Sequence, residues 1–189
     1  ARDKVWLLWV RAWARETVFK ARPQIADALR GFQEDGDLSV AESPEQQATE
    51  AAAICALVNQ TGKLPEAGGI GLDAAGIALL LDALEEMGMV SPLVQAVQQG
   101  WKLQTAISTV PLKLESRRLL HADQPIMNWA VSNAKQELKG SNYMVTKQAS
   151  GAAKIDPLMA AFDAAMLMFN NPQPSGSIEG FLANPIMVI

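Results

Sequence analysis

The chain has 189 residues and a formal net charge of −4, and 49% of its residues are hydrophobic while 19% are charged. These values describe one ordinary globular domain, with or without a tail, and argue against a protein that coats DNA unspecifically. No apolar run approaches the roughly 18 residues of a membrane span, and no signal-peptide pattern begins the chain. Cys55 and His121 are the only residues of their types, which excludes an intrachain disulfide and a Cys/His zinc site. Any metal bound here would have oxygen ligands, which favours Mg²⁺ or Mn²⁺.

Charge is divided unevenly along the chain. Residues 1–30 hold seven Lys/Arg and three acidic residues, and 100–154 hold eight and three, whereas 34–66 hold one and seven. Two basic segments therefore flank an acidic middle, and a fold that joins them would form a cationic groove. The alternative is that these are scattered solvent-facing charges.

The N-terminal part reads as a strand followed by helices. Lys4–Val10 is rich in β-branched and aromatic residues and predicts an interior strand, and its start without a lead-in indicates a segment cut from a longer chain. Trp6, Trp9 and Trp13 fit a core or an interface better than base-stacking platforms. Thr17 to Phe32 predicts a helix interrupted at Pro23.

The middle part alternates strands and helices. After the turn and short strand at 36–40, Ser43-Pro44 predicts the start of a helix that turns Ile54, Leu57 and Val58 inward. A glycine-rich strand over 68–73 ends at Asp73, and from Ile77 the apolar residues recur with helical spacing. This order predicts a parallel α/β layer with Asp73 at the carboxyl end of a buried strand, where ligands collect in such sheets.

Asp73 has three interpretations from this pattern. It could cap the following helix, it could belong to a dinucleotide-binding loop with Gly69, Gly71 and Gly76, or it could bind a metal. The glycine spacing does not match the dinucleotide fingerprint, and nothing else in the chain supports it. The metal interpretation requires a second carboxylate elsewhere.

The C-terminal part supplies such a carboxylate. A strand at 93–97, a helix over 103–120 and a strand or helix at 126–134 precede a hairpin of 135–139 and 143–147. His121 is expected to be structural, near the end of its helix. Asp156 precedes Pro157 as a helix cap, and the apolar helix over 158–169 buries Asp163, which needs a basic group or a metal as its partner.

A series of short motifs resembles the large terminase subunits of tailed phages. Their order along the chain carries the resemblance: Ala12-Trp13, Gly36-Asp37-Leu38, Gly71-Leu72-Asp73, Gln99-Gly100, Leu120-His121, Pro125, Asn128-Trp129, Asn133-Ala134, Lys147, Lys154-Ile155-Asp156 and Phe181-Leu182-Ala183-Asn184-Pro185-Ile186. It covers nearly the whole sequence and corresponds to the C-terminal half of those subunits.

The resemblance implies an RNase H-like nuclease domain, with a mixed sheet flanked by helices, which cuts concatemeric double-stranded DNA during packaging. In that family acidic residues hold two divalent metals, and Asp73 and Asp156 match two of them. Mg²⁺ or Mn²⁺ would be the cofactor, and Lys147 and Lys154 would face phosphates. Arg117 and Arg118 are further candidates for DNA contact.

The same resemblance implies a nuclease domain over 1–170 and a tail over 171–189. The family's first strand, which bears another metal aspartate, would precede Lys4, and Asp3 lies too close to the next strand to replace it. The expected partners are double-stranded DNA, the portal protein and the small terminase subunit in the host cytoplasm, with no membrane. The alternatives are a non-catalytic RNase H-like docking module that binds DNA or a motor protein, and an NAD-dependent oxidoreductase supported by the glycines alone.

Overall fold

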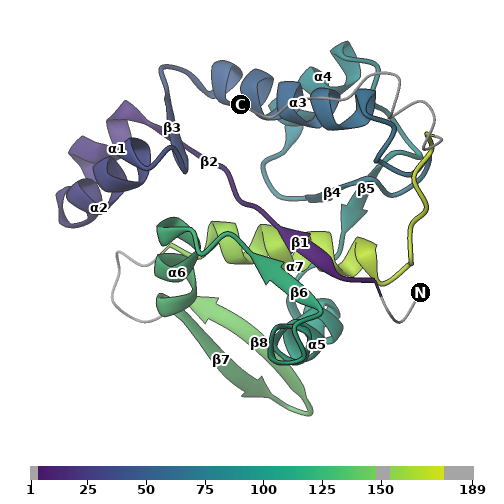
Figure 1. The fold of residues 1–189 in the computed structure, drawn as a ribbon. Helices are drawn as coiled ribbons and strands as arrows, with labels where there is room; N and C mark the ends of the chain where they lie inside the picture. Colours follow the sequence, from purple (N-terminus) through teal and green to yellow (C-terminus); the bar gives the residue numbers. More distant parts are fainter. Residues whose placement is uncertain (1–3, 148–153, 177–189) are drawn as a thin grey trace. The chain divides into compact units, whose positions relative to one another are not determined.

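The structure is a computed structural model that describes residues 4–147 and 154–176 (Figure 1). In the first half, the elements in chain order are β1 Trp6–Leu8, β2 Ala12–Arg15, α1 Glu16–Ala21, α2 Pro23–Glu34, β3 Leu38–Ala41, α3 Pro44–Gln60, β4 Ile70–Asp73 and α4 Ala78–Glu86. The second half contains β5 Val94–Val97, the short 3-10 helix η1 Gly100–Leu103, α5 Gln104–Glu115, β6 Leu119–His121, α6 Pro125–Ser132, β7 Ala134–Lys139, β8 Asn142–Lys147 and α7 Asp156–Met168.

The strands of the described residues pair two by two. β1 pairs with β6, β2 with β3 and β4 with β5, all in parallel, whereas β7 and β8 form an antiparallel hairpin. The expected mixture of parallel α/β pairs and a hairpin is therefore confirmed, although the pairs are separate ladders and not one continuous sheet. The segment expected as one strand over 4–10 forms only the short β1.

The chain divides into two compact units. The first unit comprises Ala1–Ser43 and Gln98–Met166, and the second comprises Pro44–Val97 and Leu167–Ile189. Asp156, the hairpin and α5 belong to the first unit, and Asp73 belongs to the second.

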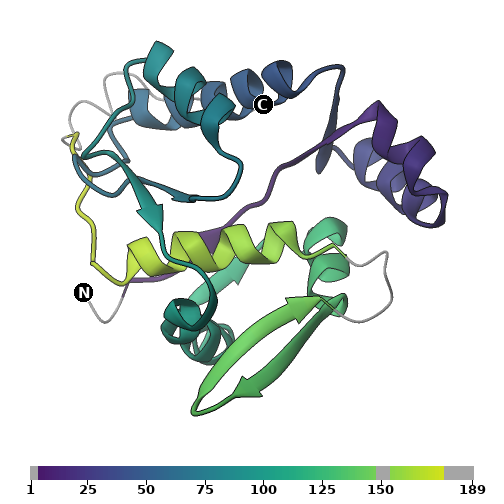
Figure 2. The same ribbon diagram turned by 180° about the vertical axis from the view of Figure 1, so that it is seen from behind.

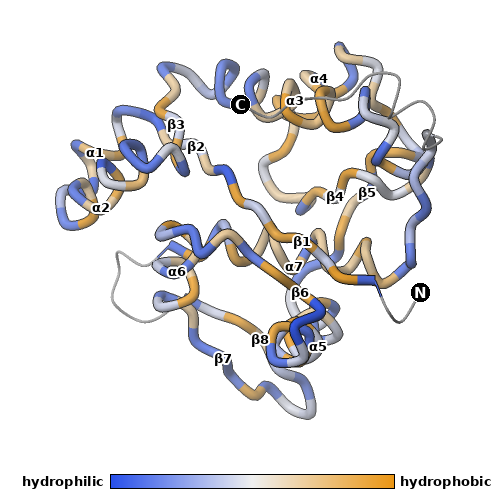
Figure 3. Tube along the Cα trace, viewed as in Figure 1, coloured by the Kyte–Doolittle hydropathy of each residue, from blue (hydrophilic) through white to orange (hydrophobic). Residues whose placement is uncertain are grey.

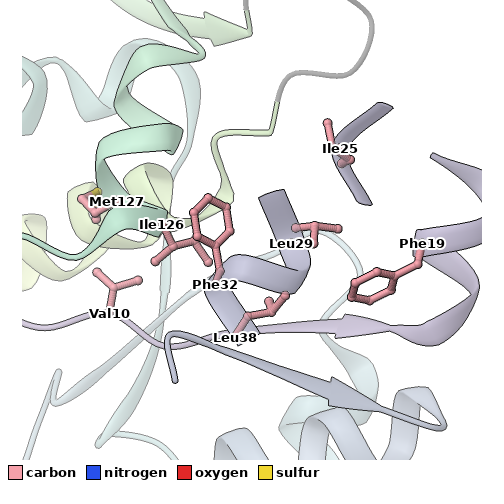
Figure 4. Packing of buried hydrophobic residues seen from close by; sticks show 8 residues of the cluster. All are labelled: Val10, Phe19, Ile25, Leu29, Phe32, Leu38, Ile126 and Met127. Atoms are coloured by element: carbon pink, nitrogen blue, oxygen red, sulfur yellow. The ribbon is translucent and has the colours of Figure 1, made fainter. Parts of the chain in front are cut away.

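The core of the first unit is built from large side chains. Val10, Phe19, Ile25, Leu29, Phe32, Leu38, Ile126 and Met127 form one buried cluster, which Figure 4 shows side chain by side chain. The Phe32 and Trp129 rings lie 5.5 Å apart and tilted, which fixes α2 against α6. α7 lies on one face of the β1–β6 pair (Figures 1 and 2), since Leu8 of β1 and Leu158 of α7 pack against the same cluster.

The core of the second unit combines alanines with larger side chains. α3 packs against α4 and buries Ala48 and Ala52 against Ala83, Leu84 and Met89. The prediction that Leu57 and Val58 point inward is wrong, because their side chains are 51% and 37% exposed. Alanines occupy the contact because two helices approach most closely where their side chains are small.

The largest difference from the sequence-based expectation lies at the end of α5. The helix expected over 103–120 ends at Glu115, and Leu119–His121 forms β6. His121 is therefore a strand residue, and the prediction that it lies at a helix end is wrong. The ambiguous segment after Pro125 is helix α6, and the hairpin is confirmed with the residue pair Lys139 and Asn142 flanking its turn.

The segment after α7 is partly tied to the second unit. The Ser175 amide donates to the Leu64 carbonyl at 3.0 Å, and the Gly176 amide donates to the Gly62 carbonyl at 2.9 Å. The remaining tail residues, 177–189, lie outside the described part of the chain, as does Asp3. Over the described residues, no helix combines the length and apolar character needed to cross a membrane.

Candidate metal centre

Asp73 is the last residue of β4, where it pairs with Val97 of β5. Its side chain is exposed, and its Oδ1 accepts a hydrogen bond from the Ala75 amide at 3.1 Å. This is the local turn that aspartate side chains form with the backbone two residues on. The helix α4 starts only at Ala78, with Ile77 as its N-cap, so the interpretation of Asp73 as a helix cap is wrong.

The glycines before Asp73 make room for the chain's own side chains. A Cβ atom on Gly71 would lie 2.8 Å from both Leu167 Cδ1 and Val97 Cγ2, and one on Gly69 would lie 2.7 Å from Leu93 Cδ1. Packing within the second unit therefore accounts for these two glycines. They provide no support for the dinucleotide-binding interpretation.

Asp156 occupies the first turn of α7, and its side chain is exposed between two buried neighbours, Ile155 and Pro157. The carbonyl of Lys154 accepts a hydrogen bond from Asn133 Nδ2 at 3.2 Å. Asn133 directly precedes Ala134, which pairs with Lys147 across the hairpin. The backbone of Lys147 and of Lys154 is thus held at one end of the hairpin, and Asp156 follows Lys154 by two residues.

Arg117 and Arg118 lie in the turn between α5 and β6, a strongly hydrophilic stretch of the trace (Figure 3). The Arg117 amide donates to the Leu114 carbonyl at 3.0 Å, and the Arg118 amide donates to the Lys113 carbonyl at 2.7 Å. This pair of bonds is a Schellman motif, whose left-handed position usually holds glycine. Arg117 occupies that position with a φ of 55°.

Two buried carboxylates are held by glutamine side chains. Gln99 Nε2 donates to Asp163 Oδ1 at 2.7 Å, so a neutral amide supplies a partner where the sequence suggested a cation or a metal. Gln124 Nε2 donates to Asp37 Oδ1 at 2.7 Å and also to the Val10 carbonyl at 2.8 Å. Sequence reasoning missed the burial of Asp37, because the Gly36-Asp37 pattern is typical of an exposed turn.

Neither of these carboxylates completes a metal site with its neighbours. Asp37 is only 7% exposed, and its Oδ2 has no hydrogen-bond partner within the described ranges. Across residues 4–147 and 154–176, no three His, Cys, Asp or Glu side chains are gathered closely enough to hold a metal ion. His121 is exposed, and its Nδ1 accepts from the Asp123 amide at 3.1 Å.

A cavity of about 280 Å³ in the first unit is also unsuited to a metal. Its walls are mainly aliphatic, including Leu119, Met127 and Leu158, and their only polar members are His121 and Asn128. Hard cations bind several carboxylate and carbonyl oxygens at once, and the side chains of this lining offer only the Asn128 carbonyl. Asp73 and Asp156 therefore remain the candidates, and their pairing across the two units stays a prediction.

Comparison with known proteins identifies a family and a solved structure that the chain resembles. The family model "Terminase large subunit, endonuclease domain" matches residues 32–171. The crystal structure of the HK97 bacteriophage large terminase superposes with a TM-score of 0.63 at 17% sequence identity. The superposition covers 87% of this chain and 34% of that one, so the chain spans about a third of the solved terminase.

A search among curated proteins returned no match. The structural likeness confirms the expected mixed α/β fold of a terminase nuclease domain. The family match extends over most of the chain and includes both Asp73 and Asp156. The chain therefore belongs to the terminase large subunit endonuclease domain family.

Proposed function

We propose that this chain is the metal-dependent endonuclease domain of a phage or prophage packaging terminase, with Asp73 and Asp156 as its metal ligands. The family match across both residues carries the proposal. The donor chemistry fits, because both carboxylates are exposed, lie at the end of a strand or the start of a helix, and offer the hard oxygens that Mg²⁺ and Mn²⁺ prefer.

The proposed substrate is concatemeric double-stranded DNA. When bound, two divalent ions supply activation of a water and stabilisation of the leaving 3′ oxygen in an in-line displacement. Asp73 and Asp156 hold the ions through their carboxylate oxygens. Lys147 and Lys154 bind the phosphates beside the cut, and Arg117 and Arg118 bind the duplex further away. We assign the nuclease to residues 1–170 and a tail to 171–189.

The work of this domain takes place in the host cytoplasm, on DNA delivered with the portal protein and the small terminase subunit. These partners follow from the function of a packaging motor. They are proposed for the whole terminase, of which the chain corresponds to one part.

The test is replacement of Asp73 by Asn in a longer chain that includes the strand expected before Lys4, with plasmid cleavage measured in Mn²⁺, because little or no cleavage is expected of the present chain alone. An Asn Oδ1 still accepts from the Ala75 amide, so the turn is kept while the charge is lost. Loss of a direct ligand should lower cleavage by more than about 100-fold, since even outer partners of ligands cost 10- to 100-fold in metal affinity. Asp156→Asn should have the same effect.

Asp82→Asn is the matched control, because Asp82 is another exposed aspartate of the second unit, on α4. It should cut DNA at the rate of the unaltered chain. Calorimetric titration with Mn²⁺ provides the second measurement. The saturable heat of Mn²⁺ binding should disappear when Asp73 or Asp156 is replaced by Asn. Undiminished cutting and unchanged Mn²⁺ heat in both variants would contradict the proposal and favour a non-catalytic docking module.

A further inference from the structure

The outer face of α3 is apolar and partly exposed near the end of the helix. The inner face packs against α4 through Ala48 and Ala52 (Figure 1). Ile54, Leu57 and Val58 are spaced three and four residues apart, so they lie together on the side of the helix away from α4. Leu57 is 51% exposed and Val58 is 37% exposed, while Ile54 is half-buried. These three side chains form an apolar strip along the last turns of α3.

The part of α3 that carries the apolar strip has no charged side chain. Residues 51–60 contain no Asp, Glu, Lys or Arg. A segment that covers the strip would therefore bury no charge of the helix, and burial of an unpaired charge is the most costly part of forming a contact. Covering the strip is also favourable in itself, because it removes apolar surface from water. The occupant that fits this surface is an apolar segment with few charges.

The chain leaves the described part of the structure close to the apolar strip. The Gly176 amide donates to the Gly62 carbonyl at 2.9 Å, and the Ser175 amide donates to the Leu64 carbonyl at 3.0 Å. A Cβ atom on Gly62 would lie 2.8 Å from the Gly176 Cα atom, so the two backbones touch at this point. Gly62 follows Val58 by four residues, which is about one helical turn. The rest of the chain therefore starts about one turn from the strip.

The composition of the rest of the chain fits the apolar strip. Eight of the 13 residues over 177–189 are hydrophobic and only Glu179 is charged, so this segment can cover an uncharged surface. Ile178, Phe181 and Leu182 repeat the spacing of three and four residues found in the strip. Ile178 lies two residues beyond the described part and Leu182 lies six, which is about 7 Å and about 20 Å of extended chain. All three side chains are therefore within reach of the strip.

Attachment favours this segment over a separate molecule. A binding segment joined by a short linker acts at an effective concentration in the mM range, whereas a second copy or another protein must bind from a more dilute solution. The connection is itself held at two points. A Cβ atom on Gly71 of β4 would lie 2.8 Å from Leu167 Cδ1, and the chain is bound again at Gly176. Residues 167–176 and α3 belong to the same unit.

We propose that the C-terminal segment folds back on its own chain, with Ile178, Phe181 and Leu182 packed on the apolar strip of α3. The docked segment covers the outer face of α3, so that this helix is packed on two sides. It also occupies a surface that would otherwise be open to a second copy of the chain or to another apolar segment. This inference is independent of the proposed nuclease function and holds whether or not the chain cuts DNA.

Disulfide formation tests the docking in the full chain. Cys55 is first replaced by Ala, and Leu57→Cys is then combined with Phe181→Cys. A disulfide requires the two Cβ atoms to approach to about 4 Å. At a chain concentration of about 10 μM, an effective concentration in the mM range should make the bond form roughly 100-fold faster within a chain than between chains. A fast bond in a monomeric product is the expected result.

The combination of Leu79→Cys with Phe181→Cys is the matched control. Leu79 is 41% exposed and lies on α4 of the same unit, away from the apolar strip. This pair should form a bond no faster than separate chains do. Equal rates for the two pairs would overturn the proposal. Disulfide-linked dimers of the Leu57 variant would also overturn it, because they would show that a second copy covers the strip.

Methyl NMR of the full chain gives an independent measurement. Phe181→Ser with Leu182→Ser removes the apolar side chains of the segment and leaves α3 unaltered. The methyl signals of Leu57 and Val58 should shift in this double variant, because they lose the side chains packed on them. Glu179→Gln is the matched control within the segment and should leave the same signals in place. Unchanged Leu57 and Val58 signals in the double variant would overturn the proposal and leave the strip to a separate protein.

Discussion

The two units of the chain differ in charge and in the size of the side chains that fill them. Pro44–Val97 contains seven acidic residues and one lysine, whereas Gln98–Met166 contains eight Lys/Arg and five acidic residues. The charge of Pro44–Val97 is therefore strongly negative and that of Gln98–Met166 is positive. Under the proposed function, the first unit would bind the duplex and Asp73 would contribute through a bound cation.

The two units also differ in the size of the side chains at their internal contacts. The first unit fills its core with Phe19, Phe32 and other large side chains, whereas the second places alanines and glycines where its elements meet. Small side chains allow close approach, but they leave little room for an added atom. The second unit should thus be the less tolerant of added volume.

Replacement of Gly71 by Ala tests this difference most strongly. The new methyl group would lie 2.8 Å from Leu167 Cδ1 and Val97 Cγ2, so it should lower the free energy of unfolding by about 1–3 kcal/mol. Gly31→Ala in α2 is the matched control, because nothing lies within 4 Å of its Cβ position. It should raise the free energy of unfolding by roughly 0.5–1 kcal/mol, since alanine is the better helix former. Urea unfolding of both variants measures the contrast, and equal effects would show that packing density does not distinguish the units.

Local sequence signals predicted several elements correctly, because each signal lies within the element it defines. Ser43-Pro44 starts α3 and the turn at Gly140 closes the hairpin, whereas Asp156, expected as the cap of α7, is its first helical residue. Asp73 was likewise placed correctly at the end of its strand. In each case the capping or turn chemistry is complete within a few residues.

The features that sequence missed depend on contacts or on an unusual residue. The end of α5 was hidden because Arg117 holds the left-handed position where glycine would have marked a helix end. The buried Asp37 accepts a hydrogen bond from Gln124, which lies 87 residues away in the sequence. The pairing of Asp73 with Asp156 stays a prediction for a similar reason, since a local pattern defines the element of each carboxylate but not its distant partner.

Replacement of Arg117 by Gly tests whether the first unit keeps a cation at the expense of stability. Glycine removes the strain of roughly 1–2 kcal/mol that a side chain causes in the left-handed conformation. It also raises the entropy of the unfolded chain, so the free energy of unfolding should increase by only about 0.5–1 kcal/mol. Arg117→Ala keeps the strain and should not stabilise. Both variants should weaken DNA binding by the same few-fold, because both lack the guanidinium. The proposed DNA contact would be wrong if affinity stayed constant, and the strain argument would be wrong if the glycine variant were no more stable than the alanine variant.

Cys55 gives the most delicate test of close packing in the second unit. It lies on α3 beside the Ala48–Leu84 cluster, and burial raises the pKa of its thiol above the ordinary value of 9.0. Because only the thiolate reacts quickly with iodoacetamide, the folded chain should be alkylated slowly at pH 8, and the pH profile of the reaction should lie at higher pH than in urea. The raised pKa also means that the neutral thiol's contribution to stability is complete below pH 9 and is lost as the pH rises through the folded-state pKa.

Gly71→Ala, which loosens the same unit, should speed the alkylation of Cys55 at pH 8, whereas Gly31→Ala should not. Equal rates in the folded and unfolded chain would show that the α3–α4 contact is too open to exclude water from the thiol.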